Sequence, residues 1–339
     1  MSGLPVGKLR AEMLQAFLDK VPVHDPRVLV GPRVGEDAAV IALGERCLVA
    51  TTDPITFATD EAAWYAVQVN VNDLAVRGAR PRWFLVTLLL PEGATTAALV
   101  EQLFGELGRA CEEADVALVG GHTEVTHGLD RPVIVGTMLG EVDRDKLVTT
   151  GGAQVGDAVV MTKGVPLEGA CLLARDREAE LVARGVRAAV IRRAKGFLRA
   201  PGISVRPEAE IACELAPVHA MHDATEGGIA TALHELAQAS GVGLRLDRDR
   251  IVVLPEGAEI CRALGLDPLG TLASGALLMT LAPADAAVVI HALAREGIDS
   301  HFIGQVVPAD RGLTLVEGAR TEPLPRFAQD EIARIFRDA

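Results

Sequence analysis

The chain alternates short, strongly apolar segments with longer segments in which apolar residues recur at helical spacing. The run from Trp83 to Leu90 is apolar almost throughout and ends at Pro91, which is typical of a buried strand. In the preceding segment, 61–78, Val67 and Leu74 lie on one face of an expected helix. This alternation restricts the chain to helices packed on sheets, the α/β or α+β class.

Both halves of the chain show the same alternation. The expected helices are 8–20, 61–78, 95–114, 168–175, 178–198, 208–215, 226–239 and 284–296. The expected strands are a hairpin at 34–47 and single strands at 48–52, 83–90, 116–119, 133–139, 158–162, 243–247, 276–281 and 301–306. The stretch 144–156 is rich in small and polar residues, which indicates a boundary. We therefore predict two α/β domains, 1–150 and 151–339.

Charge and cysteine content narrow the class of protein. The formal net charge of −13 argues against a nucleic-acid partner, because phosphate backbones are bound by clustered Lys and Arg. Five scattered cysteines without a CxxC pair are typical of reduced thiols in a cytoplasmic protein. The longest apolar run, 83–90, is too short to cross a bilayer, so we expect no membrane span.

Four aspartates share a local context that suits Mg²⁺. They are Asp37 in GEDAAV, Asp53 in TTD, Asp73 in NDL and Asp223 in HDATEGG. Each lies beside small residues near the end of an apolar element, or on the polar side of a helix. Mg²⁺ takes oxygen ligands and usually only one or two carboxylates per ion, with phosphates and water completing the shell. Asp is also a usual turn or cap residue, so each segment taken alone fits either role.

A glycine pair opens the expected helix at 226–239. Gly227 and Gly228 lie in its first turn, where Asp223 or Thr225 is placed to cap it. Exposed N–H groups at the positive end of a helix form a ready anion site. Close packing of the helix also favours glycine, so both roles remain open.

A second glycine pair, Gly120-Gly121, follows the expected strand at 116–119 and begins the segment GGHTE. Glycine at a strand end lets a ligand approach the backbone. Glu124 is a further candidate metal ligand, and His122 is a candidate acid or base or a structural histidine. The chain contains neither a Walker A lysine motif nor a GxGxxG fingerprint, and Lys163 matches no P-loop spacing.

Five segments, GEDAAV, TTD, VNDLAVRGARP, GGHTEVT and HDATEGGIATALHELAQASGVGL, occur in an order that resembles the aminoimidazole ribonucleotide synthetase (PurM-like) superfamily. Within it, the chain is similar to the hydrogenase maturation proteins HypE and to AIR synthase-related proteins, over about residues 30–310. The resemblance implies an N-terminal α/β domain whose sheet pairs with that of a second subunit in a barrel-like homodimer. A C-terminal α/β domain flanks it, and ATP with Mg²⁺ binds between the domains.

The resemblance also implies roles for individual residues. Position by position, the metal ligands are Asp37, Asp53, Asp73 and Asp223. The nucleotide-binding residues are Asp37, Asn72, Gly120, Gly121, Thr123, Gly227 and Gly228. Asp73 and His122 are the candidate catalytic residues. The chemistry shared by the superfamily is attack of a substrate oxygen, or a similar nucleophile, on a phosphate of ATP.

The end of the sequence departs from the HypE pattern. HypE carries a terminal Pro-Arg-Ile-Cys whose cysteine accepts a carbamoyl group, whereas this sequence ends Ile335-Phe-Arg-Asp-Ala, and its last cysteine is Cys261. We therefore expect an ATP- and Mg²⁺-dependent enzyme that activates the oxygen of a separate substrate, with hydrogenase maturation as the pathway and a carbamoyltransferase-like protein as a partner. A small-molecule kinase resembling thiamine-monophosphate kinase and a non-catalytic ATP-binding scaffold are the alternatives. The sequence leaves open whether His122, Lys163 or His222 contacts the substrate.

Overall fold

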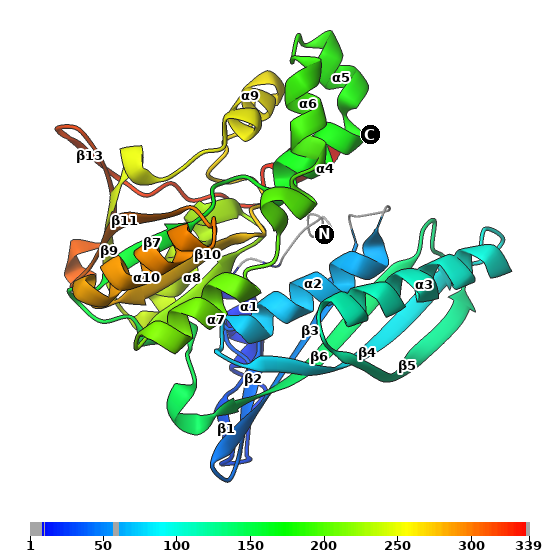
Figure 1. The fold of residues 1–339 in the computed structure, drawn as a ribbon, viewed down its shortest axis with the longest axis horizontal. Coiled ribbons are helices and arrows are strands. Elements are labelled where there is room, and N and C mark those ends of the chain that lie inside the picture. The colour runs from blue at the N-terminus through cyan, green and yellow to red at the C-terminus, as the bar shows by residue number, and fades with distance from the viewer. Residues whose placement is uncertain (1–8, 10, 57–60, 337–339) are drawn as a thin grey trace. The chain divides into compact units, whose positions relative to one another are not determined.

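The computed structural model describes residues 9, 11–56 and 61–336 (Figure 1). It divides into two compact units. The six-stranded unit comprises Val23–Pro32 and Asp37–Leu147. The seven-stranded unit comprises the described residues of Met1–Pro22, together with Arg33–Glu36 and Val148–Ala339. The short segment 33–36 therefore groups with the second half of the chain.

The six-stranded sheet has the strand order β1-β2-β3-β6-β4-β5. Its strands are β1 (Val28–Val30), β2 (Ala39–Leu43), β3 (Arg46–Ile55), β4 (Arg80–Pro91), β5 (Ala117–Thr126) and β6 (Val133–Asp143). Neighbouring strands are antiparallel except β4 and β5, which are parallel. The predicted hairpin turn is present between β2 and β3, where Gly44 has a φ of +70°.

Two helices, α2 (Ala62–Ala75) and α3 (Ala97–Glu113), cover one face of this sheet (Figure 1). Two glycines of β6 allow α2 to lie close to it. A Cβ on Gly136 would lie 2.5 Å from Nδ2 of Asn70, and one on Gly140 would lie 2.5 Å from Cδ2 of Leu74. Asp73, expected on the polar side of the helix at 61–78, is buried, as are Asn70 on α2 and Arg77 just beyond its end.

The opposite face of the same sheet is only partly covered. Burial along β6 alternates strictly between buried and half-buried residues, because successive side chains point to opposite faces. β5 is the edge strand, and nearly all of its residues are exposed. Among them are the apolar side chains of Leu118, Val119 and Val125.

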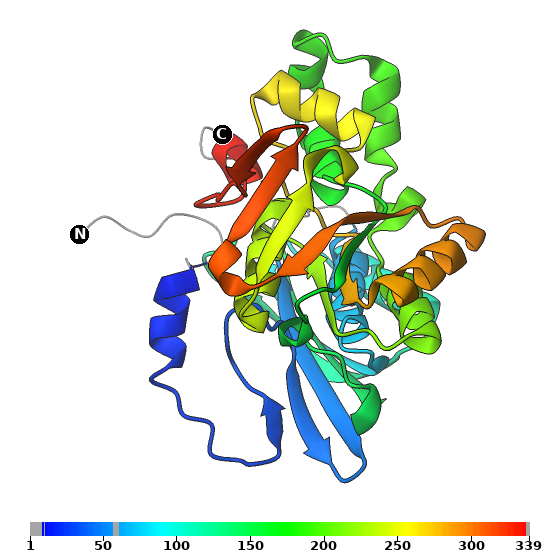
Figure 2. The same ribbon diagram turned by 90° about the vertical axis from the view of Figure 1, so that its left-hand side faces the viewer.

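The seven-stranded sheet has the order β13-β12-β9-β11-β7-β10-β8. Its strands are β7 (Ala158–Thr162), β8 (Ala220–Ala224), β9 (Gly243–Asp247), β10 (Ala276–Leu281), β11 (Ser300–Val307), β12 (Leu313–Glu317) and β13 (Arg320–Pro323). The pair β9–β12 is parallel, and the other pairs are antiparallel. Figure 2 shows β12, β9 and β11 as orange-red, yellow and orange neighbours.

The helices of this unit are α1 (Ala11–Leu18), α4 (Glu168–Asp176), α5 (Glu178–Ala183), α6 (Ala188–Lys195), α7 (Arg206–Leu215), α8 (Gly228–Ser240), α9 (Pro255–Leu264), α10 (Pro283–Arg295) and α11 (Ile332–Phe336). Helix α8 packs on β8 and β10 within the main apolar core. All residues of β7, β8 and β10 are buried. In the described chain, no helix has both the length and the apolar character that a membrane span requires.

Several secondary-structure predictions for the second half were wrong, and β12, β13 and α11 were not predicted. The expected helix 178–198 is broken into α5 and α6, because Gly185 adopts a left-handed φ of +83°. Strand β8 was not predicted, since Met-His-Asp is not an apolar run. It forms by pairing with β10, which aligns Asp223 with Leu277. Helix α9 was also missed.

Candidate functional site

Thr51 is the organising residue of the acidic site in the six-stranded unit. Its Oγ1 lies 2.6 Å from Oδ2 of Asp73 and 2.8 Å from the carbonyl oxygen of Asp37. Asp53 lies two residues further along β3, so its side chain is on the same face of the sheet as that of Thr51. The six-stranded unit thus brings the Asp73 carboxylate and the backbone of Asp37 to one hydroxyl group, and it places Asp53 on the same face of the sheet. Sequence reasoning did not assign Thr51 a role, although alternation along TTD indicates its direction.

Asp73 is 3 % exposed, which places a carboxylate in the interior of the six-stranded unit. Burying a carboxylate is costly unless hydrogen bonds or a cation compensate. Its neighbour Asn72 is fully buried too. Adjacent residues of a helix point in different directions, so Asn72 and Asp73 do not present their side chains to the same point.

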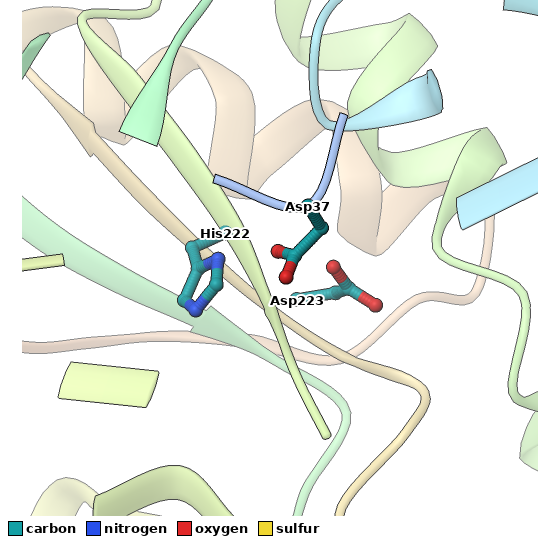
Figure 3. A group of neighbouring side chains, drawn as sticks. All are labelled: Asp37, His222 and Asp223. Carbon is teal, nitrogen blue, oxygen red and sulfur yellow. The ribbon is translucent and has the colours of Figure 1, made fainter. Parts of the chain in front are cut away.

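His222 and Asp223 occupy β8 of the seven-stranded unit and are both buried (Figure 3). His222 faces α8, where its Nε2 lies 3.0 Å from Oε2 of Glu235. Asp223 is the next residue of the strand and therefore points to the other side of β8. The Glu235 partner was not foreseen from the sequence, because the pair forms only when α8 packs on β8.

The segment Arg33–Glu36 is held on α8 at the same point. A Cβ added to Gly35 would lie 3.4 Å from the carbonyl oxygen of Glu235, and Gly35 has a left-handed φ of +84°. Arg33 and Glu36 form an ion pair of 2.8 Å, in which the Glu36 side chain is fully buried. Asp37 is the next residue after Glu36, so the Cα atoms of the two residues are only about 3.8 Å apart. Figure 3 draws this exposed aspartate with His222 and Asp223.

The glycine pair at the start of α8 is placed as predicted, but its capping differs. Gly227 is itself the N-cap residue, and it has no side chain to cap the helix. Its N–H donates instead to Oδ2 of Asp330, at 2.6 Å. Gly228 has a φ of +65°, and a Cβ there would lie 2.4 Å from the carbonyl oxygen of Leu269. Glycine is therefore required at 228 by close packing, and an anion already lies at the helix start.

Two further carboxylates near this helix start have raised pKa values. Burial raises the pKa of Asp330 to about 6, with a smaller contribution from the charge of Glu226. Burial also raises the pKa of Glu168 to about 7, where a hydrogen bond with Ser274 acts in the opposite direction. Neither carboxylate could be foreseen as part of the site, because both are far from Gly227 in the sequence.

The sequence predicted that the GGHTE segment follows the end of a strand. The segment lies instead within β5. A Cβ on Gly121 would lie 1.9 Å from the carbonyl oxygen of Val86 on the parallel strand β4, so this glycine allows the two strands to pair. His122 and Thr123 are exposed, and Nε2 of His122 lies 3.0 Å from Oε2 of Glu124. Gly120 is likewise exposed.

Lys163 is committed to a structural role. Its Nζ donates to the carbonyl oxygens of Ser204 at 2.5 Å and Gly202 at 3.1 Å, and lies 2.7 Å from Oε1 of Glu208. An ammonium group has three N–H donors, and these three oxygens account for all of them. The side chain is therefore fixed inside the seven-stranded unit.

The five cysteines are poorly suited to nucleophilic chemistry. Burial raises the pKa of Cys111 and Cys213 to about 11 and that of Cys261 to about 12. Burial also raises the pKa of Cys47. Cys171 is buried and donates its S–H to the carbonyl oxygen of Lys195, at 3.2 Å. Because the thiolate is the reactive form, the raised pKa values of four thiols and the burial of Cys171 lower the reactivity of these cysteines at neutral pH.

Comparisons with known proteins agree with this architecture. Residues 35–142 match the family model of the AIR synthase related protein, N-terminal domain, and residues 154–316 match that of its C-terminal domain. A carbamoyl dehydratase HypE of Rhodobacter capsulatus is 32% identical over 339 residues, which cover 96% of this chain and 95% of the relative. A putative hydrogenase expression/formation protein of Methanocaldococcus jannaschii is 29% identical over 329 residues, which cover 94% of each chain.

Solved structures share the fold over nearly the whole chain. HypE in a HypE–HypF complex superposes with a TM-score of 0.75 at 21% identity, covering 94% of this chain and all of the other. HypE in complex with ATP gives 0.71 at 23% identity, covering 94% and 91%. The thiamine monophosphate kinase of Aquifex aeolicus gives 0.66 at 23% identity, covering 92% and 97%.

Proposed function

The chain belongs to the family of AIR synthase related proteins, and from this premise we propose that it binds ATP with Mg²⁺ and uses a phosphate of ATP to activate a substrate oxygen. The contacts of Thr51 with the Asp73 carboxylate and the Asp37 backbone, with Asp53 on the same face of β3, carry the proposal. Carboxylate and hydroxyl oxygens without sulfur ligands suit Mg²⁺ better than zinc or copper. A bound Mg²⁺ would neutralise phosphate charge that this acidic chain does not neutralise by itself.

We propose that Asp223 of the seven-stranded unit is also a ligand of Mg²⁺. Asp223 is 1 % exposed, and Asp73 is also buried, so both carboxylates gain from a nearby divalent cation. Asp37 is joined covalently to the segment that lies on Glu235, the partner of His222. In this assignment His222 positions Glu235 and α8, and the aspartates hold the metal.

The nature of the relatives favours a substrate of the amide or carbamoyl class. The Rhodobacter capsulatus relative is described as a carbamoyl dehydratase, and the Methanocaldococcus jannaschii relative as a hydrogenase expression/formation protein. ATP activates such a group by phosphorylating its oxygen, which then leaves as phosphate. Since burial raises the pKa of four of the thiols and the fifth, Cys171, is buried, we propose that another molecule carries the group. A protein partner is a candidate carrier, because the HypE of the solved complex binds HypF.

Phosphorylation of a small molecule is the second candidate function. The fold of a thiamine monophosphate kinase superposes almost as well as that of HypE, with a TM-score of 0.66 against 0.75. The two reactions differ in where the phosphate ends. It is released as inorganic phosphate after oxygen activation and loss, and it remains on the product of a kinase.

Nucleotide binding is the first expectation to test. We expect Mg²⁺ with a non-hydrolysable ATP analogue to raise the thermal unfolding temperature, whereas Mg²⁺ alone and the analogue with EDTA have smaller effects. At a concentration about 100-fold above Kd, binding stabilises the native state by about 2.7 kcal/mol. Turnover is then followed with γ-labelled ATP and carbamoyl, amide or alcohol substrates. Neither a thermal shift nor label transfer or release with any of them would contradict the proposed function.

The edge strand β5 supports the expectation of a homodimer. An exposed edge strand with apolar side chains on it is normally covered by another chain. We propose that β5 and the half-buried face of the six-stranded sheet pair with a second copy. Val125→Lys should therefore shift the sedimentation-equilibrium mass from dimer to monomer. Val182→Lys is the matched control, because both valines are 56 % exposed and Val182 lies on α5. A monomeric parent, or a dimeric Val125→Lys variant, would refute the pairing.

A further inference from the structure

The hydroxyl group of Thr51 connects α2 with the segment that precedes β2. Thr51 is buried on β3, Asp73 is buried on α2, and Asp37 lies two residues before β2 begins. Oγ1 of Thr51 lies 2.6 Å from Oδ2 of Asp73 and 2.8 Å from the carbonyl oxygen of Asp37. One hydroxyl therefore faces two protein oxygens that come from different elements of the six-stranded unit.

The contact with Asp73 is a strong hydrogen bond. Its length of 2.6 Å lies within the usual range of about 2.5–2.7 Å for a hydroxyl that donates to an ionised carboxylate. The last bond of an aspartate side chain rotates over a broad range, so the backbone of α2 does not by itself determine how the carboxylate is turned. Thr51 restricts that rotation, because its β-branched side chain is stiff and β3 is paired on both sides, with β2 and β6.

The contact with Asp37 holds a backbone position that lies outside the strands. The pairing of β2 with β3 begins at Ala39, two residues after Asp37. The exposed side chain of Asp37 leaves the backbone beside the carbonyl group that Thr51 contacts. The same hydroxyl therefore restricts the carboxylate of one proposed Mg²⁺ ligand and the backbone of another.

We propose that Thr51 is a positioning residue of the Mg²⁺ site, which acts through Asp73 and does not itself bind the metal. This inference rests on the proposed function, in which Asp73 is a metal ligand. A ligand that is already oriented loses less conformational freedom when the metal binds, so the metal binds more tightly. Hydrogen-bonding partners of metal ligands typically contribute about 10- to 100-fold to metal affinity.

The first test is a calorimetric titration of Thr51→Val with Mg²⁺ and the non-hydrolysable ATP analogue. Valine keeps the branched shape of threonine but lacks the hydroxyl, so we expect binding about 10- to 100-fold weaker than in the parent. Thr51→Ser restores the hydroxyl and should recover most of the loss. Thr52→Val is the matched control and should bind like the parent, because Thr52 donates to the carbonyl oxygen of Gly136, at 2.8 Å, from the opposite face of the same strand.

A double-variant cycle separates positioning from direct metal binding and from a general loss of structure. Asp73→Ala should itself bind about 100-fold more weakly, because it removes a proposed ligand. If Thr51 acts through Asp73, adding Thr51→Val to Asp73→Ala should weaken binding no further. A direct metal ligand, or a residue that only supports the fold, would weaken binding by a similar factor in both backgrounds.

Three results would overturn the inference: a Thr51→Val variant that binds like the parent, a loss that Thr51→Ser does not recover, or equal losses in the two backgrounds. When Asp73→Ala binds weakly, each of these results removes the positioning role alone. If Asp73→Ala binds like the parent, Asp73 is not a metal ligand, and that part of the proposed function fails as well. Thr51→Ala replaces the valine variant if that variant does not fold. A water molecule can then fill the space of the hydroxyl, but it is not attached to β3, so the loss of affinity is still expected.

Discussion

Asp223→Asn is expected to lower the affinity for the Mg-nucleotide by about 100-fold, or about 2.7 kcal/mol, while leaving the fold intact. Replacing a group that only supports a metal ligand typically costs about 10- to 100-fold in metal affinity, so a direct ligand should cost at least as much. Asn has nearly the shape of Asp and keeps one acceptor oxygen, but it lacks the negative charge that attracts Mg²⁺.

The same substitution should not destabilise the metal-free protein. Asp223 is buried on β8, where burying a negative charge is costly. Removing that charge therefore leaves the unfolding temperature unchanged or raises it slightly. A lower affinity together with equal or higher stability is the combination that distinguishes a metal ligand from a structural aspartate.

Calorimetric titration of the Mg-nucleotide into the parent, Asp223→Asn and Asp37→Asn provides the measurement. Asp37→Asn should show a similar loss, although its side chain is exposed and contributes little to folding. Asp249→Asn, in an exposed turn of the seven-stranded unit, is the control and should bind like the parent. If Asp223→Asn and Asp37→Asn both retain the affinity of the parent, these aspartates do not hold the metal.

The sequence predicted most elements whose pattern is local. The apolar run at 83–90 lies within β4, and the helix expected at 61–78 contains α2. Hydrophobic periodicity reports burial against a sheet, so it could identify both. It could not show that the polar side of α2 is buried as well, because that depends on what packs over Asp73 and Arg77. The left-handed turn at Gly185 divides the helix expected at 178–198. A single glycine is a weaker sequence signal than the apolar pattern around it, so the turn was not predicted.

The candidate site was predictable only where its residues share a strand or a helix. Asp53 follows Thr51 at the strand period of two, so their common direction can be inferred from TTD. The bond from Gly227 to Asp330 joins residues 103 positions apart, and no local pattern announces it. For the same reason the sequence favoured Asp223 or Thr225 as the cap of α8. Tertiary packing placed a distant carboxylate there instead.

Lys163→Met is expected to have the largest effect on stability, a loss of about 3–5 kcal/mol. Nζ of Lys163 lies 2.7 Å from Oε1 of Glu208, and both side chains are almost fully buried. Removing the ammonium group leaves the Glu208 carboxylate buried without its counter-charge, and it also leaves the carbonyl oxygens of Gly202 and Ser204 without a donor. Urea unfolding of the variant, compared with the parent at the same pH, measures the loss.

Two further variants show whether the loss comes from the orphaned charge. Lys195→Met removes an ion pair of similar length, 2.6 Å to Glu178, but at a much less buried position, and should cost at most about 1 kcal/mol. The double variant Lys163→Met/Glu208→Leu removes both buried charges and should recover much of the loss, since a buried pair replaced by apolar side chains is often nearly neutral. A Lys163→Met variant as stable as Lys195→Met, or a double variant no more stable than Lys163→Met, would show that the pair is not what fixes this part of the seven-stranded unit. If Lys163→Met also kept full Mg-nucleotide affinity, as expected, the role of this lysine would be structural and separate from the site of Asp223.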